Sequence, residues 1–185
     1  MLFNSIDFII FFVIILAIIS AIRYRKFQHV FLLTASYFFF YYSSNYLITL
    51  LIASTILDFY IGKAIWSSTN ITRKKILLSV SLAGNLGLLG FFKYADFAVT
   101  QFNLFGNHFN LTSQIPLLEL ALPIGISFYT FQTISYTVDI YRGHLSPSKT
   151  LKEFALFVAF FPQLVAGPIV RAKDFLPQLR EKIDE

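Results

Sequence analysis

The stretch FFPQLVAGPIVR, residues 160–171, is strongly apolar yet carries residues that break secondary structure. Pro162 and Pro168 each lack a backbone N–H and interrupt a helix, and Gly167 allows a close approach of another backbone or a ligand. Gln163 adds two donors and an acceptor. Irregular backbone persists at membrane depth only where protein or water satisfies its polar groups. The stretch therefore predicts a re-entrant segment, or alternatively a kinked structural helix with basic residues at the interface.

The composition agrees with a membrane protein. The 185 residues are 56% hydrophobic and 14% charged, with a mean hydropathy of +0.66, whereas soluble domains are about 25% charged. The chain has no cysteine, which excludes disulfides and thiolate metal ligands. His29, His108 and His144 lie far apart and show no ligand spacing. We predict an all-α, polytopic membrane protein without a metal site or a bound cofactor.

Apolar runs separated by polar breaks predict the individual helices. A helix needs about 20 apolar residues to cross a bilayer, with about 17 as the lower limit. The predicted spans are residues 6–22, 28–42, 46–66, 76–92 and 117–141, although the second run is short and Pro123 lies near the start of the last. Residues 151–170 are predicted to form the broken, re-entrant segment. Residues 93–116 mix aromatic and polar side chains, which predicts short amphipathic pieces along the outer interface.

Basic residues predict the orientation. The N-terminus lacks a basic region and a cleavage site, which predicts a retained first helix rather than a signal peptide. If the N-terminus lies outside, Lys93 is the only basic residue expected on the outer side, which agrees with the positive-inside rule. A spanning 151–170 segment would instead place Arg171 and Lys173 outside. The sequence therefore predicts a multi-pass protein of the cell (plasma or inner) membrane, with the N-terminus outside.

Residues 122–143, LPIGISFYTFQTISYTVDIYRG, predict a helix with two polar faces. At 100° per residue, one arc of about 120° holds Ser127, Thr130, Thr133 and Thr137. The roughly opposite arc holds Tyr129, Gln132, Tyr136 and Asp139. Hydroxyl and amide side chains often join membrane helices through hydrogen bonds. The alternative is a polar cavity, which we favour for the set as a whole.

Three further features bear on packing and chemistry. Asp58 falls inside an apolar span, where ionisable residues are costly and are candidates for function, and a buried structural hydrogen bond is the equal alternative. Asp139 and Arg142 are three residues apart, so a local ion pair is expected. In GNLGLLG, the three glycines at positions 84, 87 and 90 share one helix side and predict close helix packing.

The long motifs at 122–143 and FPQLVAGPIVR resemble the membrane-bound O-acyltransferase (MBOAT) family, in its alginate O-acetyltransferase branch. MLFNSIDFIIFF, ASYFFFYY, LDFYIG and GFFKYADF resemble the same branch in the same order, so the resemblance covers the whole chain. It implies a many-helix bundle with re-entrant pieces around a buried funnel. It also implies acyl transfer from a cytosolic thioester, acetyl-CoA or an acyl carrier, to a hydroxyl of an exported polysaccharide such as alginate, with help from extracytoplasmic partner proteins.

Family members are longer, and their active-site histidine lies in a later half that no histidine here matches. The resemblance therefore implies an N-terminal part without a catalytic residue, inactive alone and paired with a missing C-terminal half. The family histidine is expected downstream of Glu185, the last residue of the sequence.

The resemblance also implies which residues line the donor channel. The expected lining is Asp58, Ser127, Thr130, Gln132, Thr133, Asp139, Gln163, Gly167, Pro168 and Arg171. D-alanyl transfer for teichoic acid modification, a transporter subunit and a non-catalytic scaffold remain alternatives, and nucleic acid is not an expected partner.

Overall fold

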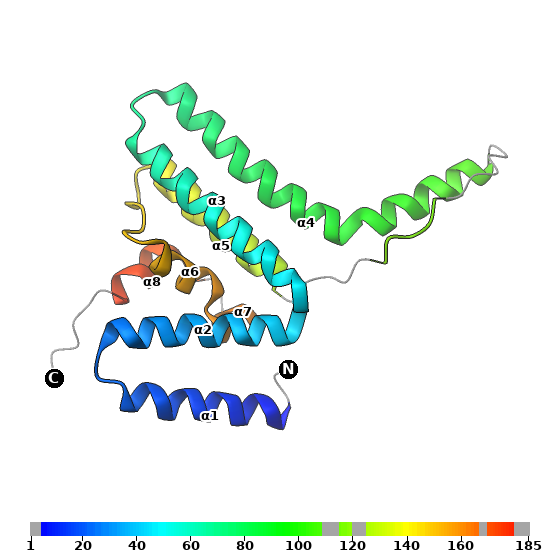
Figure 1. Cartoon of the computed structure of the whole chain (residues 1–185). Helices are drawn as coiled ribbons and strands as arrows, with labels where there is room; N and C mark the ends of the chain where they lie inside the picture. Colours follow the sequence, from blue (N-terminus) through cyan, green and yellow to red (C-terminus); the bar gives the residue numbers. More distant parts are fainter. Residues whose placement is uncertain (1–4, 109–114, 120–124, 167–169, 180–185) are drawn as a thin grey trace.

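The computed structural model describes residues 5–108, 115–119, 125–166 and 170–179, and its regular structure there is entirely helical (Figure 1). This confirms the predicted all-α class. The helices are α1 (Ile6–Ala21), α2 (Arg25–Ser44), the 3₁₀ turn η1 (Asn45–Leu47), α3 (Ile48–Ser67), α4 (Ile71–His108), α5 (Ile126–Tyr141), α6 (Leu151–Ala159), α7 (Phe161–Ala166) and α8 (Ala172–Gln178).

Helix length and composition are consistent with a membrane protein. The runs Arg25–Ser67 and Ile71–Gly106 are long and apolar enough to cross a membrane. The first run is a hairpin, because Asn45 has a positive φ of 50° and separates α2 and α3. Each of these helices has 20 residues, or about 30 Å, which matches the hydrocarbon thickness of a bilayer. Helices occupy most of each predicted span, while their crossing of the membrane stays a prediction.

The broken segment forms a wedge between α2 and α3. These two helices diverge from η1, and α6 and α7 lie between them (Figure 1). Thr150 caps α6 by accepting a hydrogen bond from the N–H of Glu153, and α6 ends before Phe160. Pro162 explains the end, because its ring would clash with the carbonyl four residues earlier in a continuing helix. The Phe161 N–H freed at the break donates to Ser36 Oγ of α2 at 3.3 Å.

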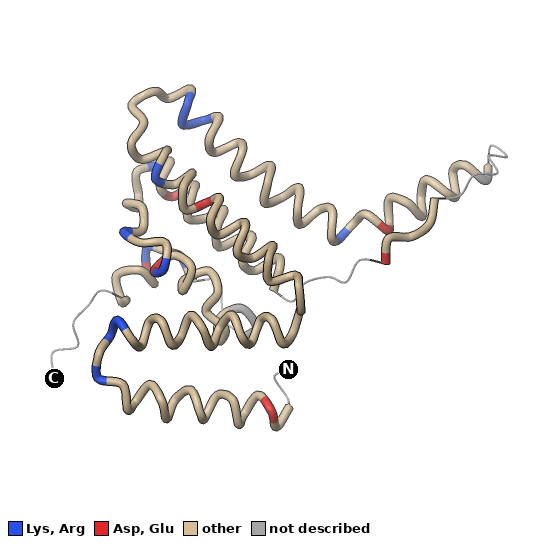
Figure 2. Tube along the Cα trace, in the orientation of Figure 1, with Lys and Arg blue, Asp and Glu red and all other residues tan. Residues whose placement is uncertain are grey.

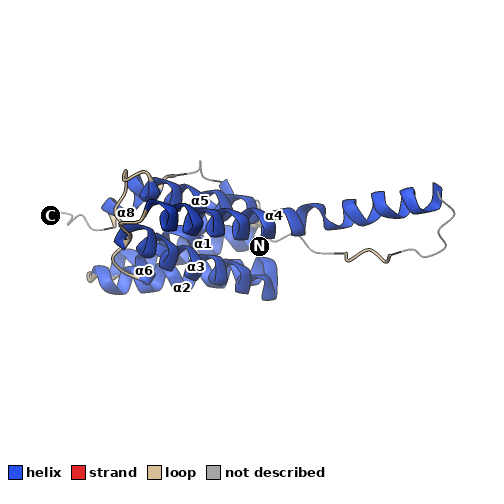
Figure 3. Ribbon diagram, turned by 90° about the horizontal axis from the view of Figure 1, so that it is seen from above, coloured by secondary structure: helices blue, strands red, loops and turns tan. Residues whose placement is uncertain are grey.

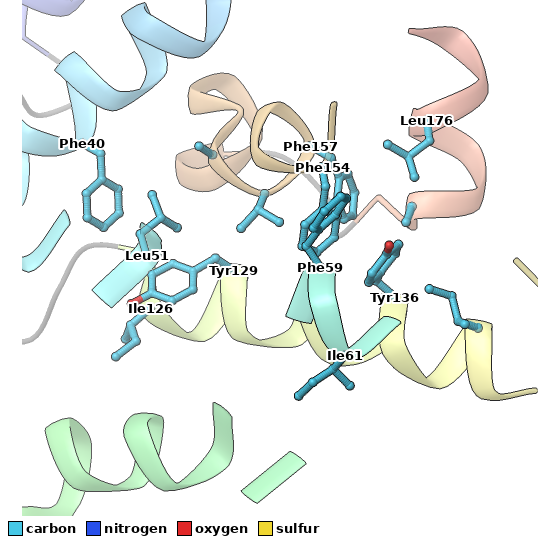
Figure 4. Packing of buried hydrophobic residues seen from close by; sticks show 14 of the residues in the cluster. Phe40, Leu51, Phe59, Ile61, Ile126, Tyr129, Tyr136, Phe154, Phe157 and Leu176 are labelled. Atoms are coloured by element: carbon cyan, nitrogen blue, oxygen red, sulfur yellow. The ribbon is translucent and has the colours of Figure 1, made fainter. Parts of the chain in front are cut away.

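Aromatic packing fixes the wedge on both sides. Phe161 inserts its ring between α1 and α2, with centroids 5.4 Å from Phe11 and 5.7 Å from Phe39. On the other side Phe154 of α6 meets Tyr136 of α5 at 4.2 Å. Figure 4 shows Phe154 and Tyr136 within one core cluster that joins α2, α3, α5, α6 and α8. The break therefore sits inside a well-packed core.

The segment after the fourth predicted span differs from its prediction. Residues 93–108 are not separate amphipathic pieces, since α4 runs on to His108 with a bend near its middle (Figure 1). Seen from above, its second half projects beyond the other helices (Figure 3). Residues 115–119 return beside it: Asn103 exchanges two hydrogen bonds with the Ile115 backbone, at 2.8 and 2.9 Å. Asp96 accepts from the Leu118 N–H at 2.7 Å.

Two other predictions on helices need correction. The last predicted span was expected to start at Leu117, but residues 115–119 are not helical and α5 begins at Ile126, after Gly125 with a φ of 75°. Pro123 lies outside the described residues. The close packing predicted for the glycines of α4 is limited to Gly84, where an added Cβ would lie 3.5 Å from Leu57. At positions 87 and 90 such a Cβ meets no atom of the described residues within 4 Å.

Candidate functional site

A buried polar network joins α3, α4 and α5. Asp58 of α3 is fully buried and accepts hydrogen bonds from Ser81 Oγ at 2.6 Å and Asn85 Nδ2 at 2.7 Å, both on α4. Thr133 of α5 donates to Asn85 Oδ1 at 3.1 Å. Thr137 Oγ1 lies 3.2 Å from Ser81 Oγ. All of the described partners of the Asp58 carboxylate are neutral groups, so donated hydrogen bonds take the place of an ion pair.

This network includes two residues of the predicted hydroxyl face of α5. Thr133 and Thr137 bind α4 through the interhelical hydrogen bonds that the sequence offered as the simpler alternative. Thr130 is fully buried, and its Oγ1 has no hydrogen-bonding partner among the described residues. Ser127 is half-buried at the start of the helix. The hydroxyl face is therefore structural toward the end of α5 and leaves an unpaired hydroxyl nearer its start.

The opposite face of α5 is also buried. Tyr136 accepts a hydrogen bond from the Ser148 N–H at 3.1 Å, which fixes the connection into α6. The other three side chains of this face keep polar atoms that have no partner in the described part of the chain: Tyr129 Oη, both amide atoms of Gln132 and Asp139 Oδ2. Buried polar groups are normally hydrogen-bonded. The unpaired polar atoms on this helix face therefore suit partners that the described residues do not supply, such as water, substrate or further protein.

A pocket of about 370 Å³ opens at the end of α5. Both apolar and polar side chains line it. Its wall consists of Phe131, Ile134, Ser135, Val138, Asp139, Arg142, His144 and Arg171. The α5 residues provide the mainly apolar wall, while two arginines and a histidine provide donors at its rim. Such a pocket can hold an amphiphile with an anionic part, because arginine forms paired hydrogen bonds to phosphate or carboxylate.

The pocket unites two residues that the sequence singled out. Asp139 and Arg171 are 32 positions apart by their numbers, and both line it. The expected Asp139–Arg142 ion pair does not involve Asp139 Oδ2, which has no hydrogen-bonding partner among the described residues. Arg142 contributes to the pocket wall.

The wedge contributes one more candidate. Gln163 is buried in α7, and its Nε2 has no partner among the described residues, although nothing places it in the pocket. Gly167 and Pro168 lie outside the described residues. Their role in a donor channel stays a prediction.

The predicted catalytic histidine is not placed by this structure. Glu185, downstream of which it is expected, belongs to residues 180–185, and these lie outside the described part of the chain. Its position relative to the pocket therefore stays a prediction.

Sequence reasoning missed several residues that these sites use. Ser81 and Asn85 are the α4 partners of Asp58, and their spacing of four on an otherwise apolar helix was an available signal. His144 was set aside as a catalytic base, yet it lines the pocket together with Arg142. Within the described residues, no group of three metal-ligating side chains occurs.

The chain is similar to bacterial O-acetylation proteins along almost its entire length. It is 36% identical to a probable alginate O-acetylase of Pseudomonas putida, over 98% of this chain and 38% of that protein. With its Pseudomonas aeruginosa counterpart the identity is 35%, over 98% of the chain and 35% of the relative. A Helicobacter pylori peptidoglycan O-acetyltransferase is 34% identical over 72% of the chain and 29% of that protein.

The chain spans little more than a third of the length of the alginate O-acetylases that it matches. No family model and no solved structure matches it. The all-helical fold, with two runs long and apolar enough to cross a membrane, is consistent with this sequence similarity. Over these residues, the chain is similar to the alginate O-acetylases, in agreement with its resemblance to the membrane-bound O-acyltransferase family.

Proposed function

We propose that the protein containing these residues is a membrane O-acyltransferase that acetylates hydroxyl groups of an exported polysaccharide. The observation that carries this proposal is the similarity to relatives named for two different acceptors, alginate and peptidoglycan. Their names share acetyl transfer to oxygen and a carbohydrate polymer. The proposal therefore specifies the transferred group and the class of acceptor, and it leaves the particular polysaccharide open.

The pocket at the end of α5 is proposed as the place where the acyl donor enters. The donor is a thioester, acetyl-CoA or an acyl carrier, and both of these carry phosphate. Arg142 and Arg171 supply the guanidinium groups that suit phosphate, while Phe131 and Val138 supply apolar wall for the thioester arm. The unpaired groups of α5, Gln132 and Asp139 among them, are proposed to meet polar parts of the donor or the water around it.

In this proposal the described residues bind and orient the donor, and they do not supply the general base. A base must lie within hydrogen-bonding reach of the acceptor hydroxyl. The resemblance places the family histidine at a position that His29, His108 and His144 do not match. The acetyl carbon of the thioester is attacked by the acceptor oxygen, the carbon–sulfur bond breaks, and the thiol leaves with the proton that the hydroxyl gives up.

The orientation follows from the charges. Apart from Lys93 in the middle of α4, Lys and Arg gather at one end of the molecule, around the α1–α2 turn, the start of α4 and the segments that lead to α8 (Figure 2). The positive-inside rule places this end in the cytoplasm. The N-terminus, at the opposite end of α1, then lies outside a cell inner membrane that the helices cross several times. The pocket opens at the basic end, which suits a cytosolic donor, and extracytoplasmic proteins would receive the product.

Replacing Arg171 tests the donor pocket. We expect Arg171→Gln in the full-length protein to raise the KM for the thioester donor about 10- to 100-fold, because a hydrogen bond to a charged group contributes about 1.5–3 kcal/mol. The measurement is ester-linked acetate on purified polysaccharide as a function of donor concentration. Ester-linked alanine in place of acetate would favour the D-alanyl alternative.

Lys173→Gln is the matched control, since Lys173 is an exposed cation two positions further on and does not line the pocket. It removes the same charge from the same end of the molecule. Equal losses in both variants would show a general effect of charge and would contradict a specific role for Arg171. Unchanged kinetics of Arg171→Gln at normal expression would overturn the donor pocket.

A further inference from the structure

A second cavity, of about 280 Å³, lies between α2, α3 and α6. Its lining is mostly apolar and differs entirely from that of the donor pocket. The wall consists of Leu33, Tyr37, Ile52, Thr55, Ile56, Leu151, Lys152 and Ala155. Thr55 donates its hydroxyl hydrogen to the Leu51 carbonyl of its own helix at 2.6 Å, so it presents no free donor there. This cavity is called the α2–α3–α6 groove.

One end of the groove is basic. Lys152 is part of its wall, and His29 on α2 lies close enough to Lys152, Arg25 and Glu153 to interact with their charges. Glu153 also accepts a hydrogen bond from Ser148 Oγ at 3.4 Å. Without counting His29, this group holds two cations and one carboxylate. An apolar groove therefore ends at a net positive site, which is complementary to an anionic headgroup.

The distance from the basic end of α2 to the far end of the groove matches one leaflet. Arg25 and Tyr37 are twelve residues apart on α2, which corresponds to about 18 Å at 1.5 Å per residue. Half of the hydrocarbon core of a bilayer is about 15 Å. Arg25 thus lies at the level of headgroups when the groove lies at the level of one acyl chain. Its volume is close to the lower limit for small-molecule sites, as expected for one flexible chain rather than a ring system.

We propose that the α2–α3–α6 groove binds an anionic phospholipid of the leaflet at the basic end. One acyl chain lies between Leu33 of α2 and Ile56 of α3, and the phosphate meets the Lys152 ammonium. Because α6 is the first helix of the wedge and forms one wall, the lipid fastens the wedge to α2 and α3. This assignment rests on the groove and its charges and is independent of the proposed acyl transfer.

Native mass spectrometry of the purified, detergent-solubilised chain tests the proposal. Dioleoylphosphatidylglycerol and dioleoylphosphatidylcholine are titrated separately, since they share acyl chains and differ in headgroup charge. We expect one tightly bound phosphatidylglycerol, with an affinity at least about 5-fold above phosphatidylcholine, as the phosphate–cation attraction contributes about 1 kcal/mol per basic residue. Inorganic phosphate added in excess is not expected to compete, because it lacks the chain.

Two pairs of variants separate the headgroup from the chain. Lys152→Gln is expected to abolish the preference for the anionic lipid, whereas Lys149→Gln, an exposed lysine outside the groove, retains it. Ile56→Trp is expected to fill the groove and remove the tight site for both lipids. Ile14→Trp, also an exposed apolar position, leaves the site intact.

The proposal is overturned if the two lipids bind alike, or if Lys149→Gln acts like Lys152→Gln. Tight binding that persists in Ile56→Trp would place the lipid elsewhere. A chain that associates into a lipid-free dimer, with Ile56→Trp shifting it to monomer, would assign the groove to a second copy instead. Competition by free phosphate would reduce the site to an anion site without a chain.

Discussion

Asp58→Ala is expected to lower the free energy of unfolding of the purified protein by about 2 kcal/mol and to loosen α4 from the bundle. The substitution removes the carboxylate that accepts from Ser81 Oγ and from Asn85 Nδ2. Asn85 Nδ2 keeps only its bond to the Ser81 carbonyl at 3.0 Å, and Ser81 Oγ keeps only its contact with Thr137 Oγ1 at 3.2 Å. An unmet buried donor costs about 1–3 kcal/mol. In membrane proteins the measured contribution of an interhelical hydrogen bond is smaller, about 0.6 kcal/mol on average. The expected loss for two hydrogen bonds therefore lies between the totals that these two figures give.

We expect α4 to be the helix that detaches when Asp58 is replaced. It has few buried residues along its length, and Ser81 and Asn85 are its buried polar contacts with α3. Because the chain contains no cysteine, a single Leu88→Cys change on the inward side of α4 reports its detachment. We expect faster labelling of this thiol by a membrane-permeant maleimide when Asp58 is alanine, together with a lower Tm in detergent.

Asp58→Asn and Ser54→Ala provide the comparisons. In Asp58→Asn the amide keeps one acceptor, and a flipped Asn85 can accept from its new N–H₂, so the expected loss is smaller than for alanine. Ser54 lies one turn earlier on α3 and bonds only its own helix, through the Leu51 carbonyl at 3.1 Å. Its alanine variant is expected to be near neutral. A Tm of Asp58→Ala equal to that of Ser54→Ala would show that the network does not hold α4.

How far the sequence predicted this fold depends on whether a feature is local. Apolar run length and the prolines of residues 160–171 are local, and they predicted the helices and the break at Phe160. The prediction for the second half of α4 was wrong, because the helix continues after its apolar run and Asn103 and Asp96 take up the returning backbone. A helix can continue past the end of an apolar run when the following residues still favour helix and their polar side chains find hydrogen-bonding partners.

The candidate site shows the same limit. That α5 carries polar faces follows from spacing alone. That Asp58 would meet Asn85, 27 positions later, depends on which sides α3 and α4 turn to each other. The pocket likewise joins Asp139 to Arg171 across the wedge. Such pairings require the packed arrangement, and a single sequence lists their members without coupling them.

The effect of replacing a glycine also depends on packing that the sequence does not show. Replacement of Gly62 is the second substitution with a large expected effect on stability. Gly62→Ala is expected to destabilise the protein by about 1–2 kcal/mol, and Gly62→Val by more. A Cβ at position 62 would lie 2.8 Å from Tyr136 Cε1 and 2.9 Å from Ile140 Cδ1. Overpacking costs about 1–3 kcal/mol, and the helix propensity gained by alanine, about 1 kcal/mol, offsets only part of it.

Tyr136 cannot simply move aside. Its Oη accepts from the Ser148 N–H at 3.1 Å, and its ring lies 4.2 Å from Phe154, so a displaced ring also disturbs the entry into α6. The cost therefore spreads from the α3–α5 contact to the wedge. We expect Gly62→Val to lower the Tm in detergent and to increase proteolysis of the Gly143–Thr150 connection.

Gly87→Ala is the matched control on α4, because no atom of the described residues lies within 4 Å of its added Cβ. There the helix propensity acts alone, and we expect unchanged or higher stability, by up to about 1 kcal/mol. The same chemical change should thus have opposite signs at the two positions in one thermal unfolding series. Destabilisation at position 87 as large as at position 62 would mean that this face of α4 packs against protein beyond the described residues. It would then support the close helix packing that the sequence predicts for the glycines at positions 84, 87 and 90.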